Sequence, residues 1–249
     1  MKLDCVLTAV NENILYLDFV PIFIKTWNKL YPDVDVKIIL IAENIPDILL
    51  SYKNNIILFK PIENIETSFT SQIIRLLYPC ILNYENGIMI TDMDMLPMNR
   101  NYYTENIKSY SNDKFIYYRE NVCFNTSQIA MCYNIATPNI WKEIFKVNSL
   151  EDIETTIKYI YNIYSKNIKW FSDQLTLYDK VLNWNKQTNN FICLKENETK
   201  FKRLDRGDDF DISNSILRNN ITNGIYSDYH CKRPMSKYAD INYEIYNLL

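Results

Sequence analysis

The chain has 249 residues, of which 47% are hydrophobic and 23% charged, and its formal net charge is −3. This composition is that of a globular protein large enough to bury a sizeable core, and it does not indicate a nucleic-acid-binding surface. With 3 glycines in total, the sequence contains neither a dinucleotide-binding nor a P-loop pattern, and the single histidine, His230, excludes a two-histidine zinc site.

The first third of the chain alternates between short apolar runs and segments with helical apolar spacing. The apolar runs predict strands over residues 2–10, 34–42, 56–59 and 87–90. Helices are predicted over residues 14–30 and 67–83, and Pro79 indicates that the second helix ends early or kinks. Strands separated by helices predict βαβ units and a mostly parallel sheet.

The remainder of the chain is more mixed and contains no internal repeat. We predict strands over residues 114–118, 129–133 and 190–194. Helices are predicted over residues 139–147, 153–164, 173–182 and 236–249, and residues 200–215 are expected to be irregular.

The cysteines indicate free thiols rather than disulfides or a metal site. None forms a Cys-x-x-Cys pair, and most lie in apolar runs: Cys5, Cys80, Cys123, Cys132, Cys193 and Cys231. An acid at position 4 comes too early for a secretory signal, and no apolar run approaches the ~20 residues that span a bilayer. We therefore expect a cytoplasmic protein without a transmembrane segment.

Two carboxylates, Asp92 and Asp94, directly follow the predicted strand 87–90, and Pro97 limits its length. Alternation along a strand places residues i and i+2 on one face, so both carboxylates point the same way if the strand continues, and they converge if the chain turns there. Carboxylates held away from water need a positive partner, and a divalent cation suits them. A solvated turn is the alternative. In a parallel sheet these residues would share one rim with Asn11, which follows the first strand.

Taken in chain order, several segments together resemble the GT-A-fold glycosyltransferases, represented by glycogenin-like enzymes and by small glycosyltransferase domains of large DNA viruses. These segments are Thr8-Ala9-Val10-Asn11 with Tyr16, Arg75, Asp92-Met93-Asp94, Phe124-Asn125-Thr126-Ser127, Trp170-Phe171-Ser172-Asp173-Gln174 and His230-Cys231-Lys232-Arg233-Pro234. The chain departs from the family pattern in lacking a glycine before Asp173 and another between His230 and Lys232.

The resemblance implies an α/β fold of GT-A type, which is a Rossmann-like, mostly parallel sheet flanked by helices with a mixed second half. It implies one glycosyltransferase domain over residues 1–249, with a nucleotide-binding half (1–98) and an acceptor-side half (99–249). The implied reaction is metal-dependent transfer from a nucleotide-diphosphate sugar to an acceptor hydroxyl, with a UDP-sugar as the favoured donor. The acceptor would be a glycan, a glycoprotein or a small molecule rather than a nucleic acid, and a viral member would act in the host-cell cytoplasm.

The resemblance also implies roles for individual residues. Asp92, Asp94 and His230 would hold Mn²⁺, with Mg²⁺ as the alternative, because an imidazole suits Mn²⁺ better. Asp173 is the expected catalytic residue, and its place at a helix start predicts a stabilised anion of lowered pKa, suited to electrostatic support. The expected nucleotide-sugar-binding residues are Thr8, Ala9, Asn11, Tyr16, Arg75, Asp92, Met93, Asn125, Gln174, Lys232 and Arg233.

Each of these positions also has a structural interpretation. Asp173 could be a helix N-cap, Asn11 a turn residue, Arg75 a surface charge and His230 a surface histidine. Arg203 and Arg206 are better explained as a solvated loop than as a basic patch. At the level of function, the alternatives are a non-catalytic carbohydrate- or protein-binding module on the same fold, and a sugar nucleotidyltransferase. The latter normally has a glycine-rich basic loop that residues 8–13 lack.

Overall fold

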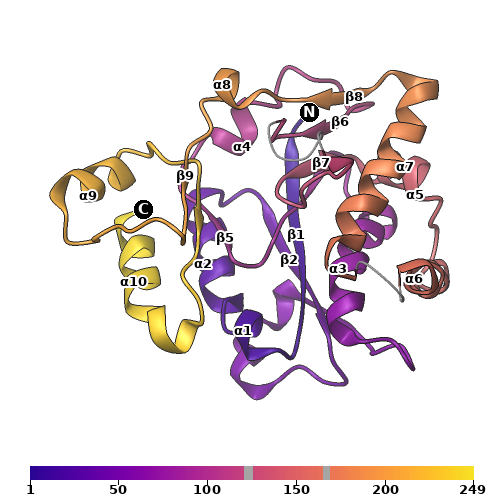
Figure 1. Ribbon diagram of the computed structural model, residues 1–249, viewed down its shortest axis with the longest axis horizontal. Coiled ribbons are helices and arrows are strands. Elements are labelled where there is room, and N and C mark those ends of the chain that lie inside the picture. Colours follow the sequence, from indigo (N-terminus) through magenta and orange to yellow (C-terminus); the bar gives the residue numbers. More distant parts are fainter. Residues whose placement is uncertain (121–125, 165–168) are drawn as a thin grey trace.

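The computed structural model describes residues 1–120, 126–164 and 169–249. Its centre is a seven-stranded sheet with the order β3-β2-β1-β4-β7-β6-β8, in which β7 alone runs antiparallel to its neighbours (Figure 1). These strands are β1 (Leu3–Asn11), β2 (Asp35–Ile41), β3 (Ile56–Phe59), β4 (Gly87–Ile90), β6 (Phe115–Tyr117), β7 (Asn134–Ala136) and β8 (Phe191–Cys193). The predicted mostly parallel α/β sheet is confirmed.

Helices cover both faces of this sheet. One face carries α3 (Thr67–Leu77), α5 (Pro138–Phe145), α6 (Leu150–Tyr164) and α7 (Ser172–Thr188), which lie on the right in Figure 1. The opposite face is covered by α2 (Val20–Leu30). Side chains alternate along β1, so that Val6 and Val10 join the core under α2 while Cys5 and Leu7 join the core under α3. Both faces are therefore apolar, as parallel sheets require.

A second, three-stranded sheet lies on the α2 side of the molecule. Its order is β5-β10-β9, from β5 (Met95–Pro97), β10 (Asp228–His230) and β9 (Arg203–Leu204). Antiparallel pairing of β10 with β5 sets His230 opposite Met95, and the amide of Cys231 donates to the carbonyl of Asp94 at 2.9 Å. This small sheet therefore brings the C-terminal histidine to the Asp-x-Asp segment.

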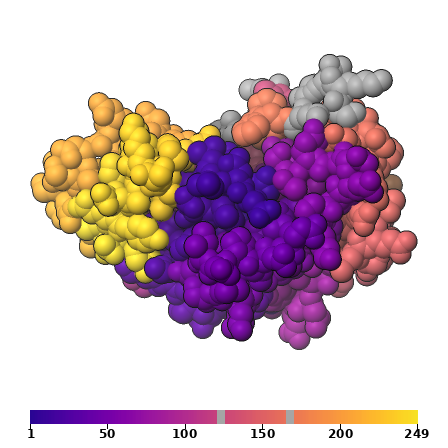
Figure 2. Space-filling model, turned by 90° about the horizontal axis from the view of Figure 1, so that it is seen from below, coloured from indigo at the N-terminus to yellow at the C-terminus, as the bar shows by residue number. Residues whose placement is uncertain are grey.

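The C-terminal helices close the α2 side. These are α9 (Ser215–Thr222) and α10 (Met235–Leu248), and Lys29 Nζ on α2 donates to the carbonyl of Tyr246 on α10 at 3.0 Å. In Figure 2 the yellow segment, which includes α10, lies against the indigo N-terminal segment. The remaining short helices are α1 (Ile14–Leu17), η1 (Asp47–Asn55), η2 (Tyr78–Ile81), α4 (Tyr102–Glu105), η4 (Lys169–Phe171) and α8 (Glu196–Thr199). No helix in the described parts of the chain is long and apolar enough to cross a membrane.

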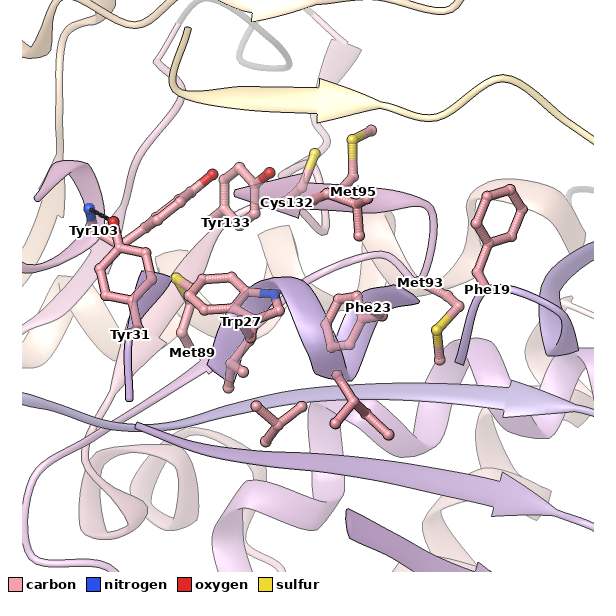
Figure 3. Packing of buried hydrophobic residues seen from close by; sticks show 14 of the residues in the cluster. Phe19, Phe23, Trp27, Tyr31, Met89, Met93, Met95, Tyr103, Cys132 and Tyr133 are labelled. Atoms are coloured by element: carbon pink, nitrogen blue, oxygen red, sulfur yellow. Dashed lines mark hydrogen bonds between the residues drawn. The ribbon is translucent and has the colours of Figure 1, made fainter. Parts of the chain in front are cut away.

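An aromatic cluster supports the turn that carries the two aspartates. Trp27 packs with its ring centre 5.2 Å from those of Tyr31 and Tyr103, and Tyr103 lies 4.7 Å from Tyr133 (Figure 3). Met93 is buried in the same core, so the residue between Asp92 and Asp94 anchors the segment.

Two predicted helices differ from the prediction in their bounds. The helix expected over 14–30 is split into α1 and α2, because Pro21 fits the first turn of a helix but not its interior. The helix expected over 67–83 ends at Leu77 and continues as the 3₁₀ turn η2, which confirms the early end predicted from Pro79.

The strand predicted over 129–133 is wrong, because β7 begins at Asn134. Residues 129–133 are buried, as their apolar character requires, but they form a loop. The side-chain amide of Asn134 donates to the carbonyls of Ala130 and Met131, at 2.7 and 3.2 Å. The run is apolar because it is buried, and the Asn134 side chain supplies hydrogen bonds to its carbonyls that a neighbouring strand would otherwise supply.

Most cysteines follow the prediction: Cys5, Cys80, Cys132 and Cys231 are buried free thiols and Cys193 is a partly exposed one, while Cys123 lies outside the described residues.

A buried ion pair ties the small sheet to the main core. Asp228 is fully buried and accepts from Arg203 Nε at 2.9 Å and from the Tyr133 hydroxyl at 2.7 Å. We expect Asp228→Asn to lower the free energy of unfolding by about 3 kcal/mol, because it leaves the guanidinium of Arg203, whose side chain is only 16% exposed, without its counter-charge. Denaturant titration measures this change. Glu244→Gln, which breaks the exposed pair with Arg218, should cost under about 1 kcal/mol, and equal losses would contradict the prediction.

Candidate active site

A cavity of about 340 Å³ opens where β1 and β4 end at their carboxyl termini. Its walls come from the end of β1, from α1, from one face of α3, from the segment after β4, from the start of α7 and from the end of β10. Among the residues singled out in the sequence, those that line it are Ala9, Asn11, Tyr16, Arg75, Asp92, Met93, Asp94, Asp173, Gln174, His230 and Arg233. The fold therefore gathers residues from distant parts of the chain into one site.

Asp94 is the carboxylate of the cavity that has three basic side chains within 4 Å of one oxygen. Its Oδ2 accepts from Arg206 Nη1 at 2.7 Å, and His230 Nε2 and Arg233 Nη1 each lie 3.6 Å from the same oxygen. Burial alone would raise the pKa of Asp94, but His230 and Arg206 outweigh it and hold the pKa at about 2. Asp94 is therefore an anion at neutral pH.

Arg75 joins the other two carboxylates. This buried side chain extends from α3, pairs with Asp92 Oδ1, and donates through Nη2 to Asp173 Oδ2 at 2.7 Å. Its Nη1 also contacts the carbonyl of Thr91 at 3.3 Å. The interpretation of Arg75 as a surface charge is thus wrong, because α3 turns this side chain toward the carboxyl end of β4.

Asp173 is the second residue of α7 rather than its N-cap, which is Phe171. Its Oδ1 accepts from the amide of Gln174 at 2.8 Å, and its exposure is 2%. Burial raises the pKa of the Asp173 carboxyl above its ordinary value, although Arg75 lowers it, and the negative charge of Asp92 adds to the rise. The expected lowered pKa is wrong, because loss of water outweighs the field of the helix terminus.

His230 is held from both sides. Its Nδ1 lies 3.1 Å from Asp205 Oδ2, and its Nε2 faces Asp94 at 3.6 Å. A carboxylate on one ring nitrogen orients the ring and leaves the other nitrogen to a second partner. The His230 side chain is therefore held in place and largely buried, and it is not a surface histidine.

The residues nearest the end of β1 bound the other side of the cavity. Arg233 donates to the Tyr16 hydroxyl and its guanidinium lies 5.3 Å from the centre of the Tyr16 ring. Asn11 Nδ2 donates to Thr67 Oγ1 at 3.1 Å, and its Oδ1 accepts from the amide of Asn13 at 3.3 Å. Asn11 therefore has the predicted turn chemistry and also lines the cavity.

Three of the singled-out residues are not part of this lining. Thr8 is fully buried, and its hydroxyl has no hydrogen-bond partner among the described residues. Lys232 Nζ donates to the carbonyls of Arg206 and Asp208, both at 3.3 Å, and so faces the loop after β9. Asn125 lies outside the described residues.

The sequence interpretation missed two residues of the cavity. The solvated loop predicted around Arg203 and Arg206 is wrong, because Arg206 pairs with Asp94 and Arg203 pairs with buried Asp228. Trp170 lines the cavity with 62% of its surface exposed. Its sequence signal is its place in the segment Trp170 to Gln174, which carries part of the resemblance, although no role was predicted for it.

The chain matches no known sequence family and no curated protein sequence. Solved structures do match. The glycosyltransferase GlyE of Streptococcus pneumoniae TIGR4 superposes with a TM-score of 0.57 at 13% identity, covering 99% of this chain and 60% of GlyE. An active-site mutant of LgtC gives 0.52 at 10% identity, with 98% of this chain and 95% of LgtC covered. The galactosyltransferase LgtC in complex with donor and acceptor sugar analogues gives 0.51 at 10% identity, with coverages of 98% and 96%.

These likenesses show the fold. The chain has the α/β architecture of these glycosyltransferases along almost its whole length, which confirms the predicted GT-A-type fold. It spans 60% of the length of GlyE and nearly all of LgtC.

Proposed function

We propose that this chain, which shares its fold with known glycosyltransferases, is a metal-dependent glycosyltransferase that uses a nucleotide-diphosphate sugar, with a UDP-sugar favoured. One observation carries the proposal. Asp92, Asp94, Asp173 and His230, which come from separate parts of the sequence, line one cavity at the carboxyl edge of the parallel strands. That edge is where open α/β sheets bind ligands. The LgtC structure with donor and acceptor sugar analogues supports a donor and an acceptor as partners.

Asp94 and His230 fit the requirements of metal ligands. Two donors that bind one ion at about 2.1 Å each lie no more than about 4.2 Å apart, and Asp94 Oδ2 and His230 Nε2 are separated by 3.6 Å. Among the described residues no group of three histidine, cysteine or carboxylate side chains is close enough to hold an ion. Asp92, which pairs with Arg75, would complete the set by leaving that pair. When bound, Mn²⁺, or Mg²⁺ as the alternative, would act as a Lewis acid on the leaving diphosphate.

The charges of the cavity support a divalent cation. The guanidinium groups of Arg75, Arg206 and Arg233 face four carboxylates in and beside the cavity, those of Asp92, Asp94, Asp173 and Asp205. The balance is therefore slightly negative when His230 is neutral. A sugar diphosphate adds about two further negative charges, and repulsion inside a partly buried site is costly. A divalent cation offsets that addition.

A test of the reaction uses the full chain with a panel of uridine and guanosine diphosphate sugars, with Mn²⁺ or with EDTA. We expect slow release of UDP from a uridine donor in Mn²⁺ and none in EDTA. Release of pyrophosphate from a nucleoside triphosphate and a sugar phosphate would instead show a nucleotidyltransferase. Binding of sugars without turnover of any donor would show a non-catalytic module.

Trp170 provides a contact for a sugar ring at the acceptor side. It is 62% exposed and lines the cavity beside Asp173 and Gln174, whereas the other tryptophans are buried: Trp27, Trp141 and Trp184. An aromatic face with an exposed surface suits the apolar face of a sugar. Because Trp170 alone is accessible to solvent, quenching of tryptophan fluorescence reports on its surroundings.

We expect Trp170→Ala to raise the KM for a glycan acceptor by roughly threefold to tenfold, the scale of one aromatic contact, with the KM of the donor unchanged. Steady-state kinetics measure both constants, and Trp184→Phe, remote from the cavity lining, is the matched control. Fluorescence quenching by UDP and Mn²⁺ without acceptor, lost in Trp170→Ala, would place Trp170 on the donor side instead.

A further inference from the structure

Arg206 occupies the place beside Asp94 where the proposed divalent metal ion would bind. Its Nη1 donates to Asp94 Oδ2 at 2.7 Å, which is closer than either His230 or Arg233 comes to that oxygen. The Arg206 side chain is 24% exposed and lines the cavity, so it borders open space on one side. A guanidinium and a divalent ion compete for the same carboxylate lone pairs.

The backbone that carries Arg206 is fixed independently of that ion pair. The carbonyl of Arg206 accepts from Lys232 Nζ at 3.3 Å, and the amide of Gly207 donates to Asp205 Oδ1 at 2.9 Å. Asp205 in turn faces His230 Nδ1 at 3.1 Å. The side chain of Arg206 can thus change partner by rotating about its own bonds while its attachment beside β10 stays in place.

We propose that Arg206 exchanges partners during the donor-binding cycle. It pairs with Asp94 as seen here, and it moves to an oxygen of the donor diphosphate when Asp94 serves as a metal ligand. Arg206 would then be a diphosphate-positioning residue that also makes metal and nucleotide binding interdependent. This inference rests on the proposed function.

The chemistry of the guanidinium supports the second partner. Arginine binds carboxylate and phosphate oxygens with the same planar donor geometry. Once Asp94 turns to a cation, the released guanidinium of Arg206 lies in a partly buried wall and needs an anion. A diphosphate beside Asp94 is the nearest one that the reaction supplies. Its hydrogen bond from Arg206 would also stabilise the charge that builds up on the departing diphosphate.

The exchange predicts opposite effects of Arg206→Gln on two affinities. Mn²⁺ binding in the absence of nucleotide should tighten by roughly threefold or more, because a competitor for Asp94 is removed. UDP binding in saturating Mn²⁺ should weaken by about tenfold, because a charged hydrogen bond is lost. Electron paramagnetic resonance of free Mn²⁺ measures the first affinity, and calorimetry with UDP measures the second.

Two further variants make the result specific. Arg206→Lys keeps the charge and should recover part of the UDP affinity, whereas Arg218→Gln on α9 removes an arginine paired with Glu244 and should change neither affinity. Thermal unfolding of each variant checks that it is folded. If both affinities of Arg206→Gln fall together, or neither changes while the wild type binds normally, the exchange is wrong and the proposed function stands. A wild type that binds neither Mn²⁺ nor UDP overturns both.

Discussion

Replacement of Asp173 by asparagine is expected to slow sugar transfer by about 10²-fold or more, while Mn²⁺ and UDP bind almost as tightly as before. The Asp173 carboxyl is 2% exposed, its Oδ2 lies 2.7 Å from Arg75 Nη2, and its Oδ1 accepts from the amide of Gln174. Asparagine keeps the shape and can still accept from Gln174. The variant therefore removes the negative charge that would support the anomeric carbon or hold a sugar hydroxyl.

Single-turnover rates at saturating donor measure this effect, with Asp179→Asn on the exposed side of α7 as the control. Because burial raises the pKa of Asp173 above 3.8, the acid limb of the wild-type rate profile should lie above that pH and be absent in Asp173→Asn. Near-normal turnover would reduce Asp173 to a structural residue of α7. A parallel loss of UDP affinity would place it in the nucleotide site, acting through Arg75.

The first four parallel strands could be predicted because each is a buried apolar run, and burial on both faces leaves a continuous pattern in the sequence. The same signal failed at residues 129–133, where the side chains are buried but Asn134 supplies the backbone partners. The burial of a segment can be predicted from its apolar residues, whereas the hydrogen-bond partner of a buried backbone group depends on the tertiary structure.

The small sheet could not be predicted in this way. β9 has two residues and β10 reads Asp228-Tyr229-His230, with no apolar alternation. These strands exist because their neighbours supply the hydrogen bonds, and Asp228 is buried only because Arg203 reaches it. The sequence motifs could place His230 in the same site as Asp94, but the β5–β10 pairing that joins them is visible only in the structure.

Among the charged residues of the site, too, some could be predicted from the sequence and others could not. Asp92 and Asp94 follow a buried strand, and that position predicts an edge-of-sheet site from the sequence alone. Arg206 sits in an irregular, charged segment whose local pattern is that of a solvated loop. Its partner Asp94 lies more than a hundred positions away, so no local spacing relates them. Site residues that follow a regular strand or helix can therefore be predicted from the sequence, whereas site residues in irregular loops cannot.

Asp94 and His230, the two proposed ligands that already face each other, provide the most direct test of the proposed metal site. We expect Asp94→Asn and His230→Gln each to weaken UDP binding in Mn²⁺ by about 10²-fold, the upper range for loss of a metal-site residue. Asp94 is an anion held 3.6 Å from the Nε2 of His230, while Asp205 lies 3.1 Å from the other ring nitrogen, Nδ1.

The decisive comparison is the response of UDP binding to EDTA, measured by calorimetry. The wild type should lose most of its UDP affinity in EDTA, whereas Asp94→Asn and His230→Gln should bind UDP equally weakly with and without Mn²⁺. Asp240→Asn on the exposed face of α10 should behave as the wild type. If either cavity variant keeps a full Mn²⁺ effect, its residue is not a ligand. If the wild type binds UDP equally well in EDTA, the guanidinium groups of Arg75, Arg206 and Arg233 hold the diphosphate without a metal ion.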